Sequence, residues 1–512
     1  MPTPPRQSSN SPQPSFPLAI DRVAIALILA LSLAIAGLLW TGQRVSAHVR
    51  AFSWQDKQIG AEDTAFILNF SRPMDYASVE PNLKIDPPLP GKVSWAGRRM
   101  AYTLTMPAPY GTEFEVRLEG ARDRFSRSQQ STIRPFRGQF RTRDRAFAYI
   151  GVEGEQEGRL VLYNLTRQEK ILLTPKDLVV MEFKFYPFGD RILFAATQRT
   201  AEPQGLLEQK LYTVTTGIEL NPPDQILPQA SEKPLDIPTK PEPAGKIELV
   251  LDNTDYQNLK FDLSADGNNI VVQRVSRRDP ADFGPWLLQA GEPPKPLKGE
   301  PGGDFLITPD SNSLAIAQGQ GLAIVPLEPG AKPLDFLPKF GTVLSFSRDG
   351  SLATMIKFNP DRTRSLFLVT SQGTYKELFQ TTGSILSSQF DPTNQILYCL
   401  LTDLKTDDDL YREEPYLAAI DLKTGNLSRL VLLPDQRDVQ FSLAPDGLAI
   451  LFDQTTRAVQ ADATTKEPLR DSSGKAIANS RLWLLPVNPN EPTTPTQPEP
   501  LPLPGLRPRW LP

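Results

Sequence analysis

The sequence predicts an all-β protein with an N-terminal transmembrane helix, a β-sandwich and then a β-propeller of about seven blades. An uncharged apolar segment near the N-terminus predicts the helix, and short alternating runs up to residue 143 predict the sandwich. A hairpin unit that recurs through the rest of the chain predicts the propeller. The predicted parts are a disordered Pro-rich tail at 1–22, a transmembrane helix at 23–40, a sandwich at 49–143 and a propeller at 144–512.

Residues 23–40, VAIALILALSLAIAGLLW, contain no charged side chain. At about 1.5 Å per residue, a helix of this length spans most of a hydrocarbon core of roughly 30 Å. Trp40 lies at the far boundary, where an indole ring is favoured. We therefore expect an uncleaved single-pass anchor. A cleaved signal peptide with Val45-Ser46-Ala47 at its cleavage site is the alternative, although its apolar region would be long for that role.

The flanking charges do not decide the orientation of this helix. Arg6 and Arg22 lie on one side, and Arg44, Arg50 and Lys57 lie on the other. Long domains can cross a membrane regardless of such charges. Because of the domains that follow, we expect a bacterial inner-membrane protein whose C-terminal domains are periplasmic or extracellular.

The composition argues against one class of partner and narrows the possible chemistry. Lys and Arg number 55 against 59 Asp and Glu, and the formal net charge is −4. A nucleic-acid binder needs a basic face to replace phosphate counterions, so we expect no nucleic-acid partner. With one His, His48, and one Cys, Cys399, a Ser–His–Asp triad or a multi-His metal site would have to use His48 or do without histidine.

Proline is the most unusual component of the chain, at 51 residues. It is concentrated in the first 17 residues, in 222–243 and in 486–512. Proline fixes one backbone dihedral and donates no hydrogen bond, so we expect these stretches to be extended or disordered.

Between residues 49 and 143, apolar and polar residues alternate over short runs separated by turn residues, which favours a β-sandwich. The predicted strands are at 64–70, 92–95, 100–105, 113–118 and 139–142.

The order of motifs here resembles the bacterial Ig-like domain of S-layer and other envelope proteins. The matching residues are Phe70-Ser71-Arg72-Pro73-Met74-Asp75, Trp95, Tyr102-Thr103-Leu104, Tyr110-Gly111-Thr112-Glu113-Phe114 and Phe140-Arg141-Thr142. The start of the domain matches poorly, and the loop at 120–135 is more basic than the family pattern. The resemblance implies a spacer or adhesion module without chemistry, in which Pro73-Met74-Asp75 forms a structural turn.

From residue 144 onward, the repeated unit is a strand, a tight turn and a second strand. The turns are Tyr186-Pro187-Phe188-Gly189-Asp190, Ala265-Asp266-Gly267, Thr308-Pro309-Asp310-Ser311, Arg348-Asp349-Gly350, Asp391-Pro392-Thr393-Asn394 and Ala444-Pro445-Asp446-Gly447. Most are about 40–55 residues apart, which is typical of four-stranded propeller blades.

Six turns predict six blades, and the two ends of this region predict a seventh. Residues 145–174 supply three strands that lack a partner hairpin, and 507–512 could form a short strand. One blade shared by both ends would remove the exposed sheet edges of an open ring. We therefore predict seven blades, with six or eight as the range. The turns resemble the propeller repeats of the TolB family, and the WD type of repeat is related; this resemblance implies the fold and not a function.

Several acidic and reactive residues are candidates for chemistry, and each has a structural explanation. The acidic run Asp407-Asp408-Asp409, with Glu413 and Glu414, lacks the spacing of a calcium loop and is expected to be a solvated loop. The turn residues Asp266, Asp349 and Asp446 are expected to hold their turns. Cys399 is expected in the core, and His48 at the surface. We single out no catalytic, cofactor-binding or metal-binding residue and expect no cofactor.

The sequence favours a binding function over an enzymatic one. We expect a membrane-anchored envelope protein in which the Ig-like module is a spacer and one propeller face binds a partner protein or a wall polymer. The alternative is an envelope hydrolase with carboxylates in the propeller funnel. Such an enzyme should show convergent carboxylates in the funnel, whereas a scaffold should show a broad apolar or aromatic face.

Overall fold

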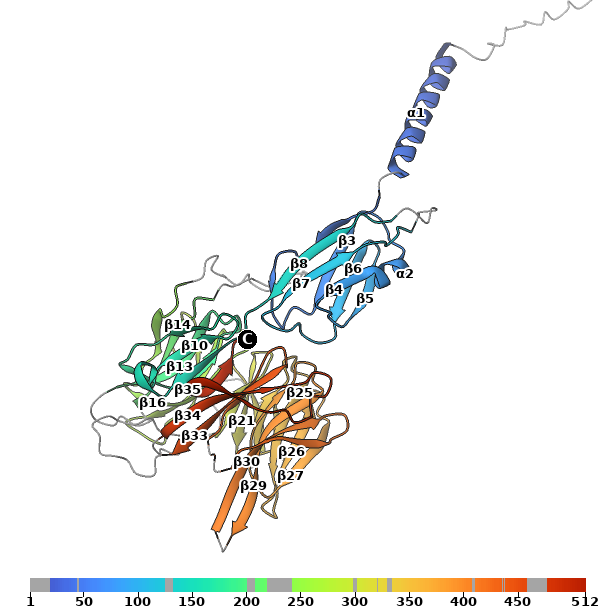
Figure 1. The fold of residues 1–512 in the computed structure, drawn as a ribbon. Helices are drawn as coiled ribbons and strands as arrows, with labels where there is room; N and C mark the ends of the chain where they lie inside the picture. The colour runs from blue at the N-terminus through green and yellow to red at the C-terminus, as the bar shows by residue number, and fades with distance from the viewer. Residues whose placement is uncertain are drawn as a thin grey trace, which may run out of the picture.

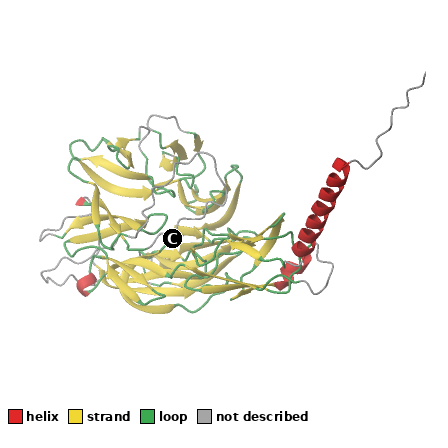
Figure 2. Cartoon of the chain, turned by 90° about the horizontal axis from the view of Figure 1, so that it is seen from above, coloured by secondary structure: helices red, strands yellow, loops and turns green. Residues whose placement is uncertain are grey.

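The structure is a computed structural model of the chain. It describes residues 19–43, 46–124, 132–199, 208–218, 242–297, 302–319, 321–328, 334–407, 410–434, 436, 438–457 and 477–512. Figure 1 shows three parts in series: a long helix, a small β-domain and a larger body of many sheets. Strand is the dominant secondary structure, which confirms the all-β class. Figure 2 shows from above that the helix projects away from the β-domains.

Helix α1 spans Ala19–Gln43 and contains the predicted helix at 23–40. It begins before the predicted end of the tail at residue 22, so that boundary was wrong; 1–18 lie outside the described residues. The apolar side chains of α1 are exposed, with 63% of Val23 and 73% of Leu33 accessible. Among the described residues, we find no helix with both the length and the apolar character needed to cross a membrane.

Strands β1 to β8 form two four-stranded sheets, with orders β1-β3-β6-β5 and β2-β8-β7-β4. Their bounds are β1 Val49–Phe52, β2 Gln58–Ile59, β3 Ala65–Phe70, β4 Leu83–Asp86, β5 Gly91–Ala96, β6 Arg99–Leu104, β7 Glu113–Leu118 and β8 Phe136–Thr142, with helix α2 Tyr76–Val79 and the 3-10 turn η1 Glu80–Asn82 before β4. All five predicted strands are present, and β1, β2 and β4 were not predicted.

The two sheets share one core because alternate residues of each strand point inward. In β7, Phe114 and Val116 are buried, and in β3 Phe66 is buried. The Trp54 ring packs edge-on against Phe66 and Phe140, with ring centroids 5.3 and 5.0 Å apart. Since Phe66 belongs to one sheet and Phe140 to the other, the two sheets form a β-sandwich.

Strands β9 to β35 pair into seven four-stranded units, which we call blades 1 to 7. Blades 2 to 6 are continuous in sequence. Blade 2 is β12 Leu178–Phe185, β13 Arg191–Gln198, β14 Lys210–Thr215 and β15 Ile247–Leu251; blade 3 is β16 Tyr256–Leu263, β17 Asn269–Ser276, β18 Phe283–Gln289 and β19 Lys295–Pro296; blade 4 is β20 Phe305–Ile307, β21 Ser313–Gln318, β22 Gly321–Pro326 and β23 Asp335–Leu337. Blade 5 is β24 Thr342–Phe346, β25 Leu352–Phe358, β26 Arg364–Thr370 and β27 Tyr375–Thr381; blade 6 is β28 Ile385–Phe390, β29 Ile396–Asp407, β30 Leu410–Asp421 and β31 Leu427–Leu432.

Blades 7 and 1 share the last strand, β35 Glu499–Trp510. Blade 7 also contains β32 Phe441–Leu443, β33 Ala449–Arg457 and β34 Ile477–Pro486, and blade 1 contains β9 Ala146–Gly151, β10 Leu160–Asn164 and β11 Glu169–Leu172, with the 3-10 turn η2 Gly154–Gln156 after β9. β35 pairs with β34 through 499–504 and with β9 through 505–510. The two ends therefore share a sheet, as predicted. Within the Pro-rich stretch at 486–512, residues 499–510 are extended in β35, and turns precede them; 222–241 lie outside the described residues.

Neighbouring blades pack face to face through buried apolar side chains. One cluster joins Leu193 of blade 2 to Phe261 of blade 3, and another joins Leu322 of blade 4 to Met355 of blade 5. The six predicted turns each contain a residue with positive φ: Gly189, Gly267, Ser311, Gly350, Asn394 and Gly447. Glycine and asparagine adopt this conformation at low energetic cost, which explains why the turns could be predicted from the sequence.

Candidate functional site

The residues singled out in the sequence lie apart from one another. Cys399 is fully buried in β29, and burial raises the pKa of its thiol, as expected for a core residue. The backbone N–H of His48 donates to Ser71 Oγ at 3.0 Å, at the end of the sandwich next to α1. Met74 of the predicted turn is buried, and Asp75 N–H donates to Arg122 O at 2.9 Å, which agrees with a structural turn.

The described residues of the acidic run belong to the hairpin β29–β30. Asp407 ends β29, and Asp408 and Asp409 lie outside the described residues. Glu413 accepts a hydrogen bond from Ser384 Oγ at 2.9 Å, and Glu414 pairs with Arg412 at 3.1 Å. In the part of the chain that the structure describes, no group of three or more His, Cys, Asp or Glu side chains is arranged to hold a metal ion.

Asp446 joins the sandwich to the propeller, in addition to holding its turn. Its Oδ1 accepts from Leu448 N–H at 3.1 Å, as a turn aspartate does. Its Oδ2 accepts from Tyr110 N–H of the sandwich at 3.0 Å and from Arg145 Nη2 at 3.2 Å. The Asp446 side chain is only 1% exposed, so both contacts are removed from water. Of the three turn aspartates, Asp266 and Asp349 make the local bonds that were predicted.

A second set of contacts surrounds Asp446 and completes a region that we call the junction. Glu62 pairs with Arg143 of the connecting segment and lies 3.7 Å from Arg348, in the turn of blade 5. Arg143 Nη1 also donates to Pro512 O at 3.2 Å. Gly111 has positive φ, and a Cβ there would lie 2.8 Å from Thr166 Oγ1 of blade 1. The sandwich therefore contacts blades 1, 5 and 7.

The connecting segment at 143–145 is held from both sides. Arg143 N–H donates to Ile59 O at 2.9 Å in the sandwich, and Arg145 N–H donates to Thr166 Oγ1 at 2.8 Å in the propeller. Burial raises the pKa of the Tyr110 hydroxyl, which accepts from Ala61 N–H at 2.9 Å. Because its backbone bonds are engaged on both sides, this segment holds the two domains in one orientation.

Carboxylates in or just before the first strands of several blades are paired with cations. Asp262 pairs with Lys184 of the neighbouring blade and accepts from Ile307 N–H at 2.8 Å. Glu182 lies 3.8 Å from Arg509, and Asp438 lies 4.0 Å from Arg507. Pairing of this kind links adjacent blades.

Asp453 is a buried carboxylate of blade 7. It is 1% exposed, and burial raises its pKa to about 6. Its two oxygens accept from Gln440 N–H and from Arg507 N–H, each at 2.7 Å. Arg507 has positive φ and lies at the register shift in the pairing of β35 with β9. Asp453 therefore holds the irregular backbone at which the ring closes.

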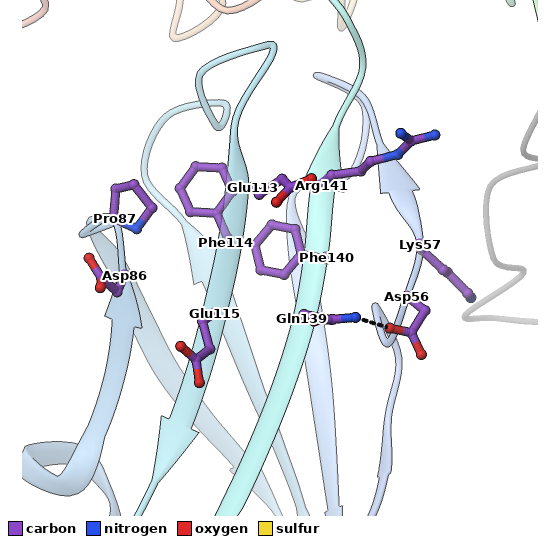
Figure 3. A pocket seen from close by; sticks show the side chains of 10 residues that line it. All are labelled: Asp56, Lys57, Asp86, Pro87, Glu113, Phe114, Glu115, Gln139, Phe140 and Arg141. Carbon is purple, nitrogen blue, oxygen red and sulfur yellow. Dashed lines mark hydrogen bonds between the residues drawn. The ribbon is translucent and has the colours of Figure 1, made fainter.

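A groove of about 640 Å³ lies on the sandwich over β4, β7 and β8 (Figure 3). Asp86, Glu113, Glu115 and Arg141 border it, and Gln139 donates to Asp56 at 2.9 Å. The Phe114 and Phe140 rings in Figure 3 belong to the core and are only 2% and 3% exposed. The groove is thus polar and offers no exposed aromatic ring on which a ligand could stack.

Several exposed apolar side chains of blades 5 and 6 lie at the end of the propeller opposite the sandwich; Tyr375 of blade 5, which is 49% exposed, is not among them. We call this set the apolar rim. It comprises Phe358 (59% exposed), Leu386 (46%), Leu404 (37%), Tyr411 (72%) and Leu432 (64%). The hairpin β29–β30, which carries Leu404 and Tyr411, projects from the body away from the sandwich (Figure 1). Arg364 Nη1 donates to Gly383 O at 2.7 Å and thereby joins blade 5 to the strand that carries Leu386.

Sequence reasoning missed the apolar rim and the second role of Asp446. The rim had a partial signal, because apolar residues such as Leu404 and Tyr411 occur among the polar residues at the ends of β29 and β30. Asp446 had none, since its turn motif matches the other turns and its sandwich partner is hundreds of residues away in sequence.

Comparisons with known proteins identify similar folds but no family. No family model matches the chain, and no curated protein matches it. Similar solved structures include TolB from Acinetobacter baumannii, with 10% identity, 84% of this chain and 83% of that chain covered, and a TM-score of 0.39. A putative 6-phosphogluconolactonase from Bacteroides uniformis has 12% identity, coverage of 72% and 99%, and a TM-score of 0.40. The dihydro-heme d1 dehydrogenase NirN has 14% identity, coverage of 71% and 74%, and a TM-score of 0.40.

Proposed function

We propose that this chain is a membrane-anchored protein of the bacterial cell envelope, in which the propeller is a protein-binding or wall-binding scaffold. In this proposal, α1 is a single-pass anchor in the inner membrane, the Ig-like sandwich at 49–143 is a spacer, and the propeller at 144–512 lies in the periplasm or outside the cell. The observation that carries the proposal is the apolar rim, because it meets the expectation for a scaffold face.

The rim supports binding of a protein more directly than binding of a polymer. Apolar side chains gathered in one place on a soluble surface are a common mark of a protein interface. Tyr411 adds an aromatic ring with a polar tip, a residue type enriched at such interfaces. Charged neighbours such as Arg412 and Glu413 would form the polar border of the contact.

The junction supports the spacer role. The sandwich contacts the propeller at the end opposite the rim, and α1 leaves the sandwich at the end farthest from the propeller (Figure 1). With the connecting segment held on both sides, a partner at the rim would be bound at a constant distance and orientation from the sandwich.

The rim is tested by capture of partners from solubilised membranes and wall extracts with the full chain as bait. We expect Tyr411→Ser combined with Leu432→Ser to abolish capture of proteins that bind the unchanged chain. Leu249→Ser is the matched control, because Leu249 is 55% exposed on β15 of blade 2 and lies outside the rim. Equal capture by all three chains would refute the assignment of the rim.

The anchor is tested separately by fractionation. An uncleaved anchor leaves the full-length chain in the membrane pellet after alkaline carbonate extraction. A cleaved signal peptide instead releases a shorter chain that begins near residue 46, and N-terminal sequencing distinguishes the two outcomes.

The hydrolase alternative is supported by one observation, the raised pKa of Asp453 beside Asp438. A carboxyl with a pKa near neutrality can act as a general acid. Both oxygens of Asp453 already accept backbone N–H groups, however, and its exposure of 1% leaves little access for a substrate. Hydrolysis of wall glycans that is lost in Asp438→Asn, while the fold is retained, would favour the hydrolase.

A further inference from the structure

The end of the sandwich next to α1 is built from loops that are tied to one another. We call it the proximal end, and its described residues are 46–50, 71–76, 96–99, 119–124 and 132–134. Ser71 N–H donates to His48 O and Arg134 N–H to Ala47 O, both at 2.9 Å. Asp75 N–H donates to Arg122 O at 2.9 Å. These bonds hold the side chains of all the loops on one surface.

The charge of the proximal end is opposite to that of the whole chain. Its described residues include seven arginines against three carboxylates, whereas the chain has a net charge of −4. Arg50, Arg98, Arg99, Arg124 and Arg134 are exposed. Two of the three carboxylates pair with the remaining two arginines of this end: Asp123 lies 3.9 Å from Arg72, and Asp75 lies 3.7 Å from Arg122. The exposed guanidinium groups therefore make the electrostatic potential at the proximal end positive.

An aromatic pair lies beside these arginines. The Tyr76 ring stacks on Trp95 with centroids 4.3 Å apart and an interplanar angle of 16°. Tyr76 is 42% exposed, and its hydroxyl donates to Gly97 O at 3.2 Å, next to Arg98. Tyr and Trp side chains are favoured at the headgroup level of a bilayer, where one part of the ring is apolar and the other is wet.

The opposite end of the sandwich does not share this character. There, Arg143 and Arg145 are engaged in the junction with Glu62 and Asp446. Among the described residues of the sandwich, the proximal end combines several exposed arginines with the pair of Tyr76 and Trp95, and α1 emerges from that end (Figure 1).

We propose that the proximal end binds anionic lipid headgroups at the membrane surface from which α1 emerges. The inference rests on the proposed anchor, because an inserted α1 brings this end to the headgroups. Guanidinium groups bind lipid phosphates through paired hydrogen bonds, and each arginine near an anionic surface strengthens binding by about fivefold. The sandwich is thereby held against the bilayer, and the apolar rim points away from it.

The test uses the full chain in proteoliposomes of phosphatidylcholine alone or of phosphatidylcholine with phosphatidylglycerol. Amide hydrogen exchange is measured in peptides that cover 71–76 and 96–99. We expect exchange to be several-fold slower with phosphatidylglycerol and the difference to vanish at high salt, which screens exposed charges. The double variant Arg98→Glu, Arg99→Glu should abolish the difference in exchange between the two kinds of vesicle. Arg141→Glu with Arg278→Glu is the matched control, with the same charge change at exposed sites outside the proximal end.

The outcomes separate this inference from the anchor proposal. A chain that inserts into both kinds of vesicle but shows equal exchange in both overturns the lipid inference and leaves the anchor standing. A chain that inserts into neither kind of vesicle overturns the anchor proposal. In that case, cosedimentation of the chain with phosphatidylglycerol vesicles that is weakened in the Arg98/Arg99 variant still supports the lipid inference. A lack of cosedimentation overturns the lipid inference as well. Protection by an added anionic wall polymer but not by phosphatidylglycerol would assign the surface to the polymer instead.

Discussion

Asp446→Ala is expected to loosen the sandwich from the propeller while both domains stay folded. The substitution removes the acceptor of Tyr110 N–H and the counter-ion of Arg145. A buried donor left without its partner costs about 1–3 kcal/mol. The substitution also removes the local bond from Leu448 N–H, which adds about 1 kcal/mol. The total loss at the junction is therefore about 2–4 kcal/mol.

Asp349→Ala is the matched control, because Asp349 occupies the equivalent turn of blade 5. Its oxygens accept from Ser347 Oγ at 2.7 Å and Ser351 N–H at 3.1 Å, which are bonds within the turn. The Asp349→Ala control should lose only the free energy of the bonds within its turn, about 1 kcal/mol. The assay is cleavage of the segment at 143–145 by a protease at low concentration, together with the interdomain distance distribution from paired spin labels. Equal cleavage and equal distributions in the two variants would refute the role assigned to Asp446.

Three further predictions concern the propeller itself. Burial raises the pKa of Asp453 to about 6, so between about pH 4 and pH 6 the folded chain keeps a proton on this carboxyl that the unfolded chain has lost. The free energy of unfolding should therefore fall by up to ~3 kcal/mol as the pH rises through this range. Urea unfolding across this range should show the fall, and Asp453→Asn should remove it. Cys399 should resist alkylation until the chain unfolds, and rapid labelling under native conditions would contradict its burial. Deletion of 505–512 should expose the edge of β9 and cause aggregation, measured by light scattering, whereas deletion of 1–18 should not.

Strands and turns were predictable because their signals are local. The alternation in 113–118 follows from one face of β7 packing into the core, and the turns need positive φ at positions such as Gly267 and Gly447. Closure of the ring was predictable because an unpaired strand at each end demands a partner. β2 was missed since Gln58–Ile59 is too short to alternate, and its parallel partner β8 is far along the chain.

The candidate site was much less predictable than the fold. The exposure of Phe358 and Leu432 results from where their strands end in the assembled blade, and the residue types alone would fit a core. The buried state of Asp446 depends on the position of the sandwich, which no local pattern records. The basic proximal end had a partial signal in the loop at 120–135, but Arg98 and Arg99 join it only through the pairing of β5 with β6.

The junction lies over the seam of the ring, which explains why one end of the sandwich touches two blades that are distant in sequence. Asp446 belongs to blade 7, whereas Thr166, beside Gly111, belongs to blade 1. Pro512, whose carbonyl accepts from Arg143, directly follows the strand that both blades share. Blades 7 and 1 share β35, whose proline residues reduce the hydrogen bonds that the strand can donate, and a buried cluster that includes Phe147 and Leu451 also joins them. Contacts from the sandwich to both sides of the seam therefore add to the interactions that close the ring.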